Sequence, residues 1–141
     1  MLVARVALAW VFIVYGAGKL FGAFGGAGLS GTATFMAQTA HLHPGMLFAV
    51  LSGSVEFFGG IAVGVGILGR LAALGLLGDM VVATATVTFG HGVVGDAAGV
   101  GYGLNLALAA LAAMVILQGT GAIGVGAVAR GRHTRPIGMK S

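Results

Sequence analysis

Residues 44–89 decide the fold of this chain and read PGMLFAVLSGSVEFFGGIAVGVGIL, then GR, then LAALGLLGDMVVATATVTF. Each of the two apolar stretches carries one acidic residue near its middle, Glu56 in the first and Asp79 in the second. At about 1.5 Å per residue, the acids lie roughly 12 to 18 Å along a helix from the start of their stretches. Because the hydrocarbon core of a bilayer is about 30 Å thick, this hairpin predicts two carboxyl groups at similar depth near the middle of a membrane.

The composition of the whole chain indicates an integral membrane protein. Of its 141 residues, 58% are hydrophobic and 7% are charged, and the mean hydropathy is +1.07. A soluble domain carries about 25% charged residues, so this chain lacks the polar surface that would keep it in water. Its 28 glycines suit membrane helices, where small residues allow close contact. The absence of cysteine excludes disulfides, thiol redox chemistry and cysteine-ligated centres within this chain.

Four apolar spans make the predicted fold class all-α, an integral membrane four-helix bundle. The spans cover about residues 2–24, 44–68, 71–89 and 100–117. They form a transmembrane domain of residues 1–126, which is followed by a basic tail over residues 127–141. The segment GTATFMAQTAHL (31–42) predicts a short amphipathic helix in the first outer loop, with a disordered loop as the alternative.

The positive charges predict an orientation. All basic residues except Lys19 fall on one side of a four-span arrangement: Arg5, Arg70, Arg130, Arg132, Arg135 and Lys140. Cytoplasmic segments are enriched in Lys and Arg, so both termini are expected in the cytoplasm. The absence of cysteine and the basic tail favour a prokaryotic inner membrane. Lys19 lies toward the other side and requires a partner or a snorkelling side chain. Nucleic acid is not expected as a partner, because the basic residues cluster after a membrane helix.

Glu56 and Asp79 have a functional and a structural interpretation. An ionisable residue inside a membrane is costly and marks a functional site by default. The functional interpretation is therefore a proton or quinone site, in which a carboxyl group exchanges a proton with a bound hydroquinone. In the structural interpretation each acid is held by a basic or polar partner. Arg5 and Lys19 are the available cations, and an Arg5–Glu56 pair is preferred, because buried charges are usually paired. The polar contacts considered for Asp79 are Asn105, Ser52 and Thr84.

The other motifs in the sequence do not indicate a binding or catalytic site. Gly60-x-x-x-Gly64 permits close packing of helices inside the bundle. The GxGxxG pattern at residues 119–124 follows an apolar helix instead of a strand, so a dinucleotide site is not expected. His41 and His43 are interpreted as solvated loop residues, and neither a metal nor a haem site is expected.

Several short motifs along the chain together resemble a known family. They are Arg5-x(6)-Phe12-x(3)-Gly16-x(2)-Lys19-Leu20-Phe21, then Glu56-Phe57-Phe58-Gly59-Gly60, Gly66-x(3)-Arg70-x-Ala72-Ala73 and Gly119-x-Gly121. In order and spacing the pattern resembles the DoxX family of small four-helix membrane proteins over nearly the whole chain. Family members often place a Ser and an acid after the closing glycines, where this chain has Gly124, Val125 and Gly126.

The resemblance implies a small membrane subunit of a redox or respiratory assembly. The family takes its name from a membrane subunit of an archaeal thiosulfate:quinone oxidoreductase, and Arg5, Lys19, Glu56 and Arg70 are its motif positions here. The three basic residues are expected in structural ion pairs, whereas Asp79 rests on its depth in the membrane alone. The chain is not expected to be catalytic by itself, because the hard chemistry belongs to a partner or cofactor.

The expected ligand and partners follow from the same interpretation. A bound quinone near Glu56 and Asp79 is the expected cofactor, and the expected partners are the lipid bilayer and other subunits of a membrane complex. Two alternatives stay open. One is a non-catalytic anchor that recruits a partner protein, and the other is a small proton-coupled transporter.

Overall fold

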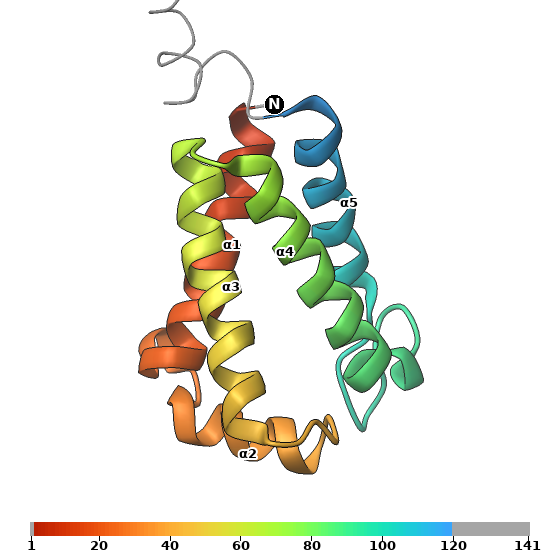
Figure 1. Ribbon diagram of the computed structural model, residues 1–141. Helices are drawn as coiled ribbons and strands as arrows, with labels where there is room; N and C mark the ends of the chain where they lie inside the picture. The colour runs from red at the N-terminus through yellow and green to blue at the C-terminus, as the bar shows by residue number, and fades with distance from the viewer. Residues whose placement is uncertain (1, 120–141) are drawn as a thin grey trace, which may run out of the picture.

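The computed structural model describes residues 2–119, and within that range it contains helices and no strand (Figure 1). The α-helices are α1 (Leu2–Phe21), α2 (Gly28–Gln38), α3 (Gly45–Val65), α4 (Gly69–Ala83) and α5 (Gly103–Gln118). A 3-10 turn η1 (Ala23–Gly25) follows α1, while a π-helical segment η2 (Thr84–Thr88) and a 3-10 turn η3 (Phe89–His91) extend α4. The predicted basic tail and the last glycine of the Gly119-x-Gly121 motif lie outside the described residues.

Three helices are long and apolar enough to cross a membrane. They are α1, α3 and the continuous helix Gly69–His91. The apolar helix α5 has 16 residues and is therefore about 24 Å long. It begins later than the predicted span because the preceding loop uses its first residues. The Tyr102 N–H donates to the Gly92 carbonyl and the Gly103 N–H to the Val93 carbonyl.

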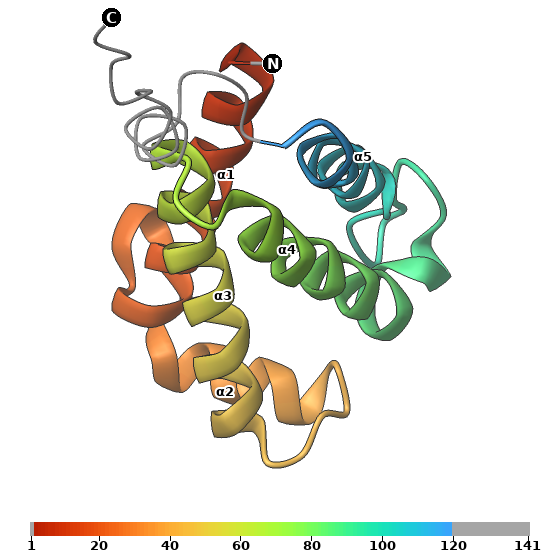
Figure 2. The same cartoon turned by 45° about the horizontal axis from the view of Figure 1, so that its top comes forward.

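The long helices form two pairs. Helix α1 packs mainly on α3, and α5 packs mainly on α4. The pairs are joined where α3 turns into α4 and splay apart toward the opposite end (Figures 1 and 2). At that end α2 packs beneath α3, burying Thr32 and Met36, and the Thr32 hydroxyl donates to the Lys19 carbonyl. The amphipathic helix predicted in the first outer loop is thus present as α2.

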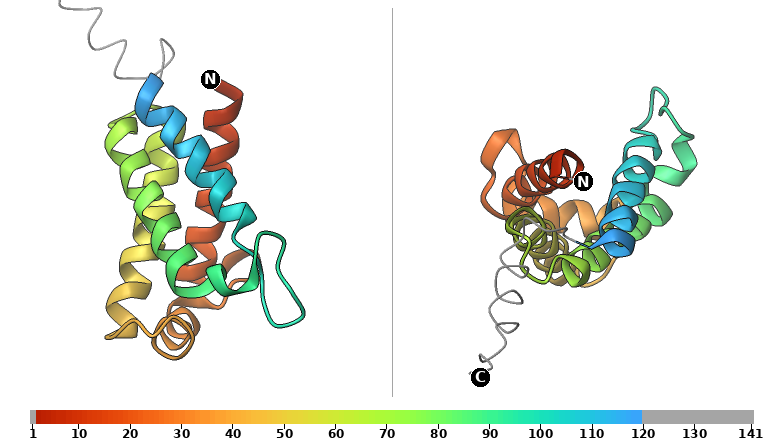
Figure 3. Two further views of the ribbon diagram at one scale, coloured as in Figure 1. Left: turned by 90° about the vertical axis from the view of Figure 1, so that its right-hand side faces the viewer. Right: turned by 90° about the horizontal axis from the view of Figure 1, so that it is seen from above.

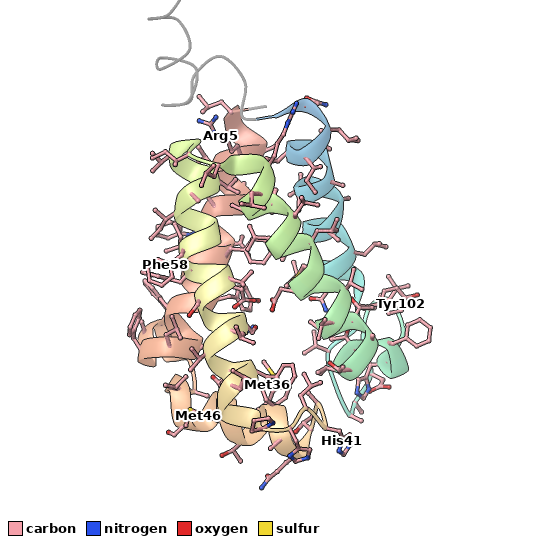
Figure 4. The ribbon with its side chains drawn as sticks, viewed as in Figure 1. Arg5, Met36, His41, Met46, Phe58 and Tyr102 are labelled. Atoms are coloured by element: carbon pink, nitrogen blue, oxygen red, sulfur yellow. The ribbon has the colours of Figure 1, made fainter. Side chains whose placement is uncertain are left out.

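Both ends of the described chain lie at one end of the bundle. The start of α1, the α3–α4 turn and the end of α5 are together at the top of Figure 1, while α2 and the loop of residues 92–102 are at the bottom (Figure 3). Arg5 lies near that top end (Figure 4), and the Arg70 guanidinium lies close to Gly119. The two basic positions therefore share an end, as an even number of crossings requires.

Glycines allow α1 and α3 to approach closely. A Cβ atom on Gly16 would lie 2.7 Å from the Cα atom of Phe57, and one on Gly60 would lie 3.0 Å from the Ala9 carbonyl oxygen. Because backbone atoms would have to move to admit even a methyl group, glycine is needed at this crossing. Gly64 faces α1 as well, so the Gly60-x-x-x-Gly64 pair serves packing within the bundle.

The apolar surface outside the bundle is extensive. The fully buried side chains include Leu8, Phe12 and Leu76, but Val3 is 82% exposed and Leu117 is 79% exposed. Large exposed apolar patches are rare on soluble monomers. Here they surround the long helices and provide the surface that contacts lipid.

The crossing of α1 and α3 gives the first prediction. Gly16→Ala should lower the free energy of unfolding by about 1–3 kcal/mol, because the added methyl group overpacks the contact with the Phe57 backbone. The matched control is Gly78→Ala, since a Cβ at Gly78 meets no atom within 4 Å. Denaturant unfolding in detergent micelles measures both variants. Equal stability of the two variants would contradict the close crossing.

Candidate functional site

Lys19 and Glu56 form an ion pair inside the bundle. Lys19 Nζ lies 2.9 Å from Glu56 Oε1 and also donates a hydrogen bond to Ser52 Oγ at 2.8 Å. Glu56 is 2% exposed, whereas the Lys19 side chain is 24% exposed. An unpaired buried carboxylate is strongly unfavourable, so Lys19 provides the charge that makes Glu56 tolerable at this position.

Lys19 takes the place that the sequence-based prediction gave to Arg5. Helices α1 and α3 run antiparallel, with Gly16 against Phe57. At this register Lys19 lies within a turn of Glu56, whereas Arg5 lies about 18 Å farther along the helix pair. Arg5 is buried near the start of α1 (Figure 4). Of the two cations that the sequence offered, the less preferred one, Lys19, is therefore the one that reaches Glu56.

Asp79 of α4 brings a second carboxyl group to the same place. It lies within hydrogen-bonding reach of the Glu56 carboxyl group, so α3 and α4 face each other across two acids. Glu56 Oε2 and Asp79 Oδ2 are both buried, and neither has a hydrogen-bond partner among the described residues. The site consequently contains two carboxyl groups and one lysine.

The polar contacts predicted for Asp79 are engaged elsewhere. Ser52 accepts the hydrogen bond from Lys19, and the Thr84 hydroxyl donates to the carbonyl of its own helix at Met80. Asn105 Nδ2 donates to Thr88 Oγ1 at 3.1 Å. Among the described residues, no hydrogen bond joins Asp79 to any of these three side chains.

The π-helical segment η2 was not predicted from the sequence. Within or beside it, the hydroxyls of Thr84 and Thr86 donate to the carbonyls four residues earlier, a bond that competes with regular helix geometry. The wider turn changes the face on which Thr88 lies, and Thr88 is buried against Asn105. Such segments are frequent at functional sites, and the run TATVT is the only local signal for it.

A cavity of about 930 Å³ lies between the two helix pairs. Its volume falls in the range of about 300–1,000 Å³ that small-molecule sites occupy. Most of its wall is apolar, and Met36 extends into it from α2 (Figure 4). Six polar side chains on the wall form two groups: Lys19, Ser52, Glu56 and Asp79 from α1, α3 and α4, and Thr88 and Asn105 from η2 and α5. The hydroxyl side chains of Tyr15, Thr32 and Thr86 line it as well.

The cavity is open at its sides. Exposed residues line it on both helix pairs, including Tyr15 of α1, Leu51 of α3 and Leu104 of α5. An apolar molecule in the lipid could therefore enter between the helices without crossing a polar surface. The two acids and the lysine are on the wall of this cavity, where Lys19 is partly exposed and Glu56 is buried.

The described residues contain no group of three or more side chains that could hold a metal ion. His41 and His43 are both exposed, and His41 lies near the end of the bundle where α2 lies (Figure 4). They contribute nothing to the cavity wall.

The loop between η3 and α5 contains a separate titratable pair. His91 Nδ1 lies 3.1 Å from Asp96 Oδ1, and the same oxygen accepts the N–H groups of Ala98 at 2.8 Å and Gly99 at 3.0 Å. These hydrogen bonds, the one from Ala98 first, hold the pKa of Asp96 below its ordinary value of 3.8. Asp96 therefore stabilises the loop conformation, and it does not line the cavity.

Comparison with known protein families gives a match over more than half of the chain. A family model described as DoxX matches residues 1–89. The matched part includes Lys19, Glu56 and Asp79, whereas Asn105 lies beyond it. No curated protein and no solved structure matches the chain.

The ion pair gives the second prediction. Lys19→Met should lower the free energy of unfolding by about 3 kcal/mol, because it leaves a buried carboxylate without its cation. The double variant Lys19→Met/Glu56→Leu should recover most of this loss, since it removes both charges. Denaturant unfolding in detergent micelles measures the free energy of unfolding of the single and double variants. A single variant as stable as the parent chain would show that Lys19 does not stabilise Glu56.

The loop gives the third prediction. The pKa of Asp96 is lower in the folded chain than in the unfolded one, so its stabilisation is complete above about pH 3.8 and is lost as the pH falls through the folded value. Amide exchange of Ala98 and Gly99 should show protection at neutral pH that declines in acid. Asp96→Ala should remove that protection at every pH. Unchanged protection in this variant would rule out the proposed role of the carboxylate.

Proposed function

We propose a quinone-binding role for this chain, which belongs to the DoxX family and is a small membrane protein. The observation that carries the proposal is the pair of carboxyl groups, Glu56 and Asp79, on the wall of a large apolar cavity. In this role the chain acts as a membrane subunit of a redox assembly. The electrons are exchanged with a partner subunit, since the chain contains no cysteine and offers no thiol or iron–sulfur centre of its own.

The arrangement in the bilayer follows from the charges. Four helices cross the membrane in the proposal, and the end that holds Arg5 and Arg70 faces the cytoplasm. Glu56 is 11 residues from the start of α3 at Gly45, which places it about 17 Å along that helix. The two acids then lie near the middle of the hydrocarbon core, at the depth where an isoprenoid quinone is dissolved.

The cavity wall suits a molecule with a compact polar ring and a long apolar tail. One polar group consists of Lys19, Ser52 and the two acids, and the other of Thr88 and Asn105. A quinone ring carries oxygen atoms on opposite edges, so polar groups from different helices are what its recognition requires. The apolar remainder of the wall and its lateral openings accommodate the tail.

The cluster also supports proton exchange. Two carboxyl groups within hydrogen-bonding reach cannot both be ionised in a medium of low dielectric beside a single cation. We therefore assign one shared proton to Glu56 and Asp79. A shared proton next to a bound ring is the arrangement that a proton-linked quinone site needs.

The fourth prediction tests occupancy of the cavity. Chain purified from native membranes should retain quinone, and Ala83→Trp should lower the total quinone recovered by at least about tenfold, which corresponds to about 1.4 kcal/mol. Ala83 lines the cavity, so the added indole ring takes up part of the space that a bound quinone would occupy. The matched control is Ala110→Trp, because Ala110 is exposed on α5 and does not line the cavity. Organic extraction and chromatography measure the quinone.

Three results would decide against the role. Absence of quinone from the parent chain, both before and after reconstitution with quinone-containing lipid, would refute it. Equal retention by the two tryptophan variants would place any bound quinone outside the cavity. Proton or solute flux through the purified chain in liposomes, without retained quinone, would favour the transporter alternative.

A further inference from the structure

Two of the oxygen atoms on the acidic side chains of the cavity wall are hydrogen-bond acceptors that lack a donor. Glu56 Oε2 and Asp79 Oδ2 are buried, and no described residue donates to either of them. Glu56 as a whole is 2% exposed. Buried acceptors that lack a donor are costly, so a donor supplied by a ligand would relieve that cost.

The nitrogen donors nearby are directed to other side chains, whereas the hydroxyls of Ser52 and Thr88 accept these bonds and keep one O–H donor each. Lys19 Nζ is directed to Glu56 Oε1 and to Ser52 Oγ, and Asn105 Nδ2 is directed to Thr88 Oγ1. A proton shared between the two carboxyl groups supplies one further donor. A carboxylate oxygen has two lone pairs, so the acceptors still outnumber the donors in the cluster.

We infer that the cavity selects a head group that donates hydrogen bonds and, resting on the proposed function, that it binds a hydroquinone more tightly than the corresponding quinone. A hydroquinone has two O–H groups, and each can donate to one of the unpaired oxygens. An oxidised quinone offers only carbonyl oxygens, which would add acceptors to a site that already has an excess of them.

The same reasoning excludes anionic head groups. Lys19 is the single cation on the described cavity wall, and Glu56 already occupies it. A fatty-acid carboxylate or a lipid phosphate would bring a charge that no described side chain on the wall can balance. The cavity therefore favours a neutral donor over the anionic amphiphiles that are abundant in a membrane.

The fifth prediction compares three ligands of one shape. The probes are a short-chain alkyl benzoquinone, its hydroquinone and the dimethyl ether of that hydroquinone, which keeps the ring and tail but has no O–H group. Binding to the full chain in nanodiscs, measured by calorimetry without oxygen, should be at least about tenfold tighter for the hydroquinone than for either other probe.

Two variants test the assignment to the acids. Asp79→Asn adds an N–H donor beside the ring, so the preference for hydroquinone should fall below about threefold through tighter binding of the quinone. Asp96→Asn changes an acid outside the cavity and should leave the preference unchanged. If Asp79→Asn does not fold, as judged by thermal unfolding, the dimethyl ether comparison on the parent chain decides.

The outcomes separate this inference from the proposed function. Equal affinity for the hydroquinone and the quinone, or tighter binding of the quinone, would overturn the selection while leaving quinone binding intact. Binding of none of the three probes would refute both. Tight binding of the dimethyl ether would show that shape governs the affinity instead of donated hydrogen bonds.

Discussion

The buried ion pair between Lys19 and Glu56 is the constraint on which the rest of the structure depends. A carboxylate that is 2% exposed can exist only beside a cation, so α1 and α3 must cross at the register that brings Lys19 to it. The glycines at the crossing allow that register, because Gly16 and Gly60 let the two backbones approach where any larger residue would separate them. Packing and electrostatics thus require the same arrangement of the two helices.

The cavity follows from how the two helix pairs are joined. The α1–α3 pair and the α4–α5 pair meet at the α3–α4 turn, and α2 packs under α3 at the splayed end (Figure 1). The space between them is large because α5 packs mainly on α4 and only weakly on α1. The π-helical segment then turns Thr88 inward against Asn105, which adds polar atoms to a wall that is otherwise largely apolar. A lipid-soluble molecule with a small polar head matches this combination.

The charge balance of the site restricts its chemistry further. One lysine faces two carboxyl groups, and two of their oxygens have no donor among the described residues. In a medium of low dielectric this favours protons and neutral donors over anions. The acid in the outer loop differs from these two. Asp96 is exposed, and its Oδ1 accepts hydrogen bonds from the N–H groups of Ala98 and Gly99. The two acids of the cavity are distinguished by burial without such partners.

The sequence by itself determined that the chain is helical and belongs to the DoxX family, because composition, span length and motif spacing are local properties. It also determined the positions of Glu56 and Asp79 along their helices, since helical rise converts residue number directly into distance along an axis. Tertiary structure alone decided that Lys19 and not Arg5 reaches Glu56, and that Asp79 faces Glu56 instead of Asn105. These outcomes depend on the register between neighbouring helices and on the rotation of each helix about its own axis. Successive side chains along a helix point in directions that differ by about 100°. Register and rotation are set by the glycine contacts and the π-helical turn, and neither can be calculated from spacing along one helix.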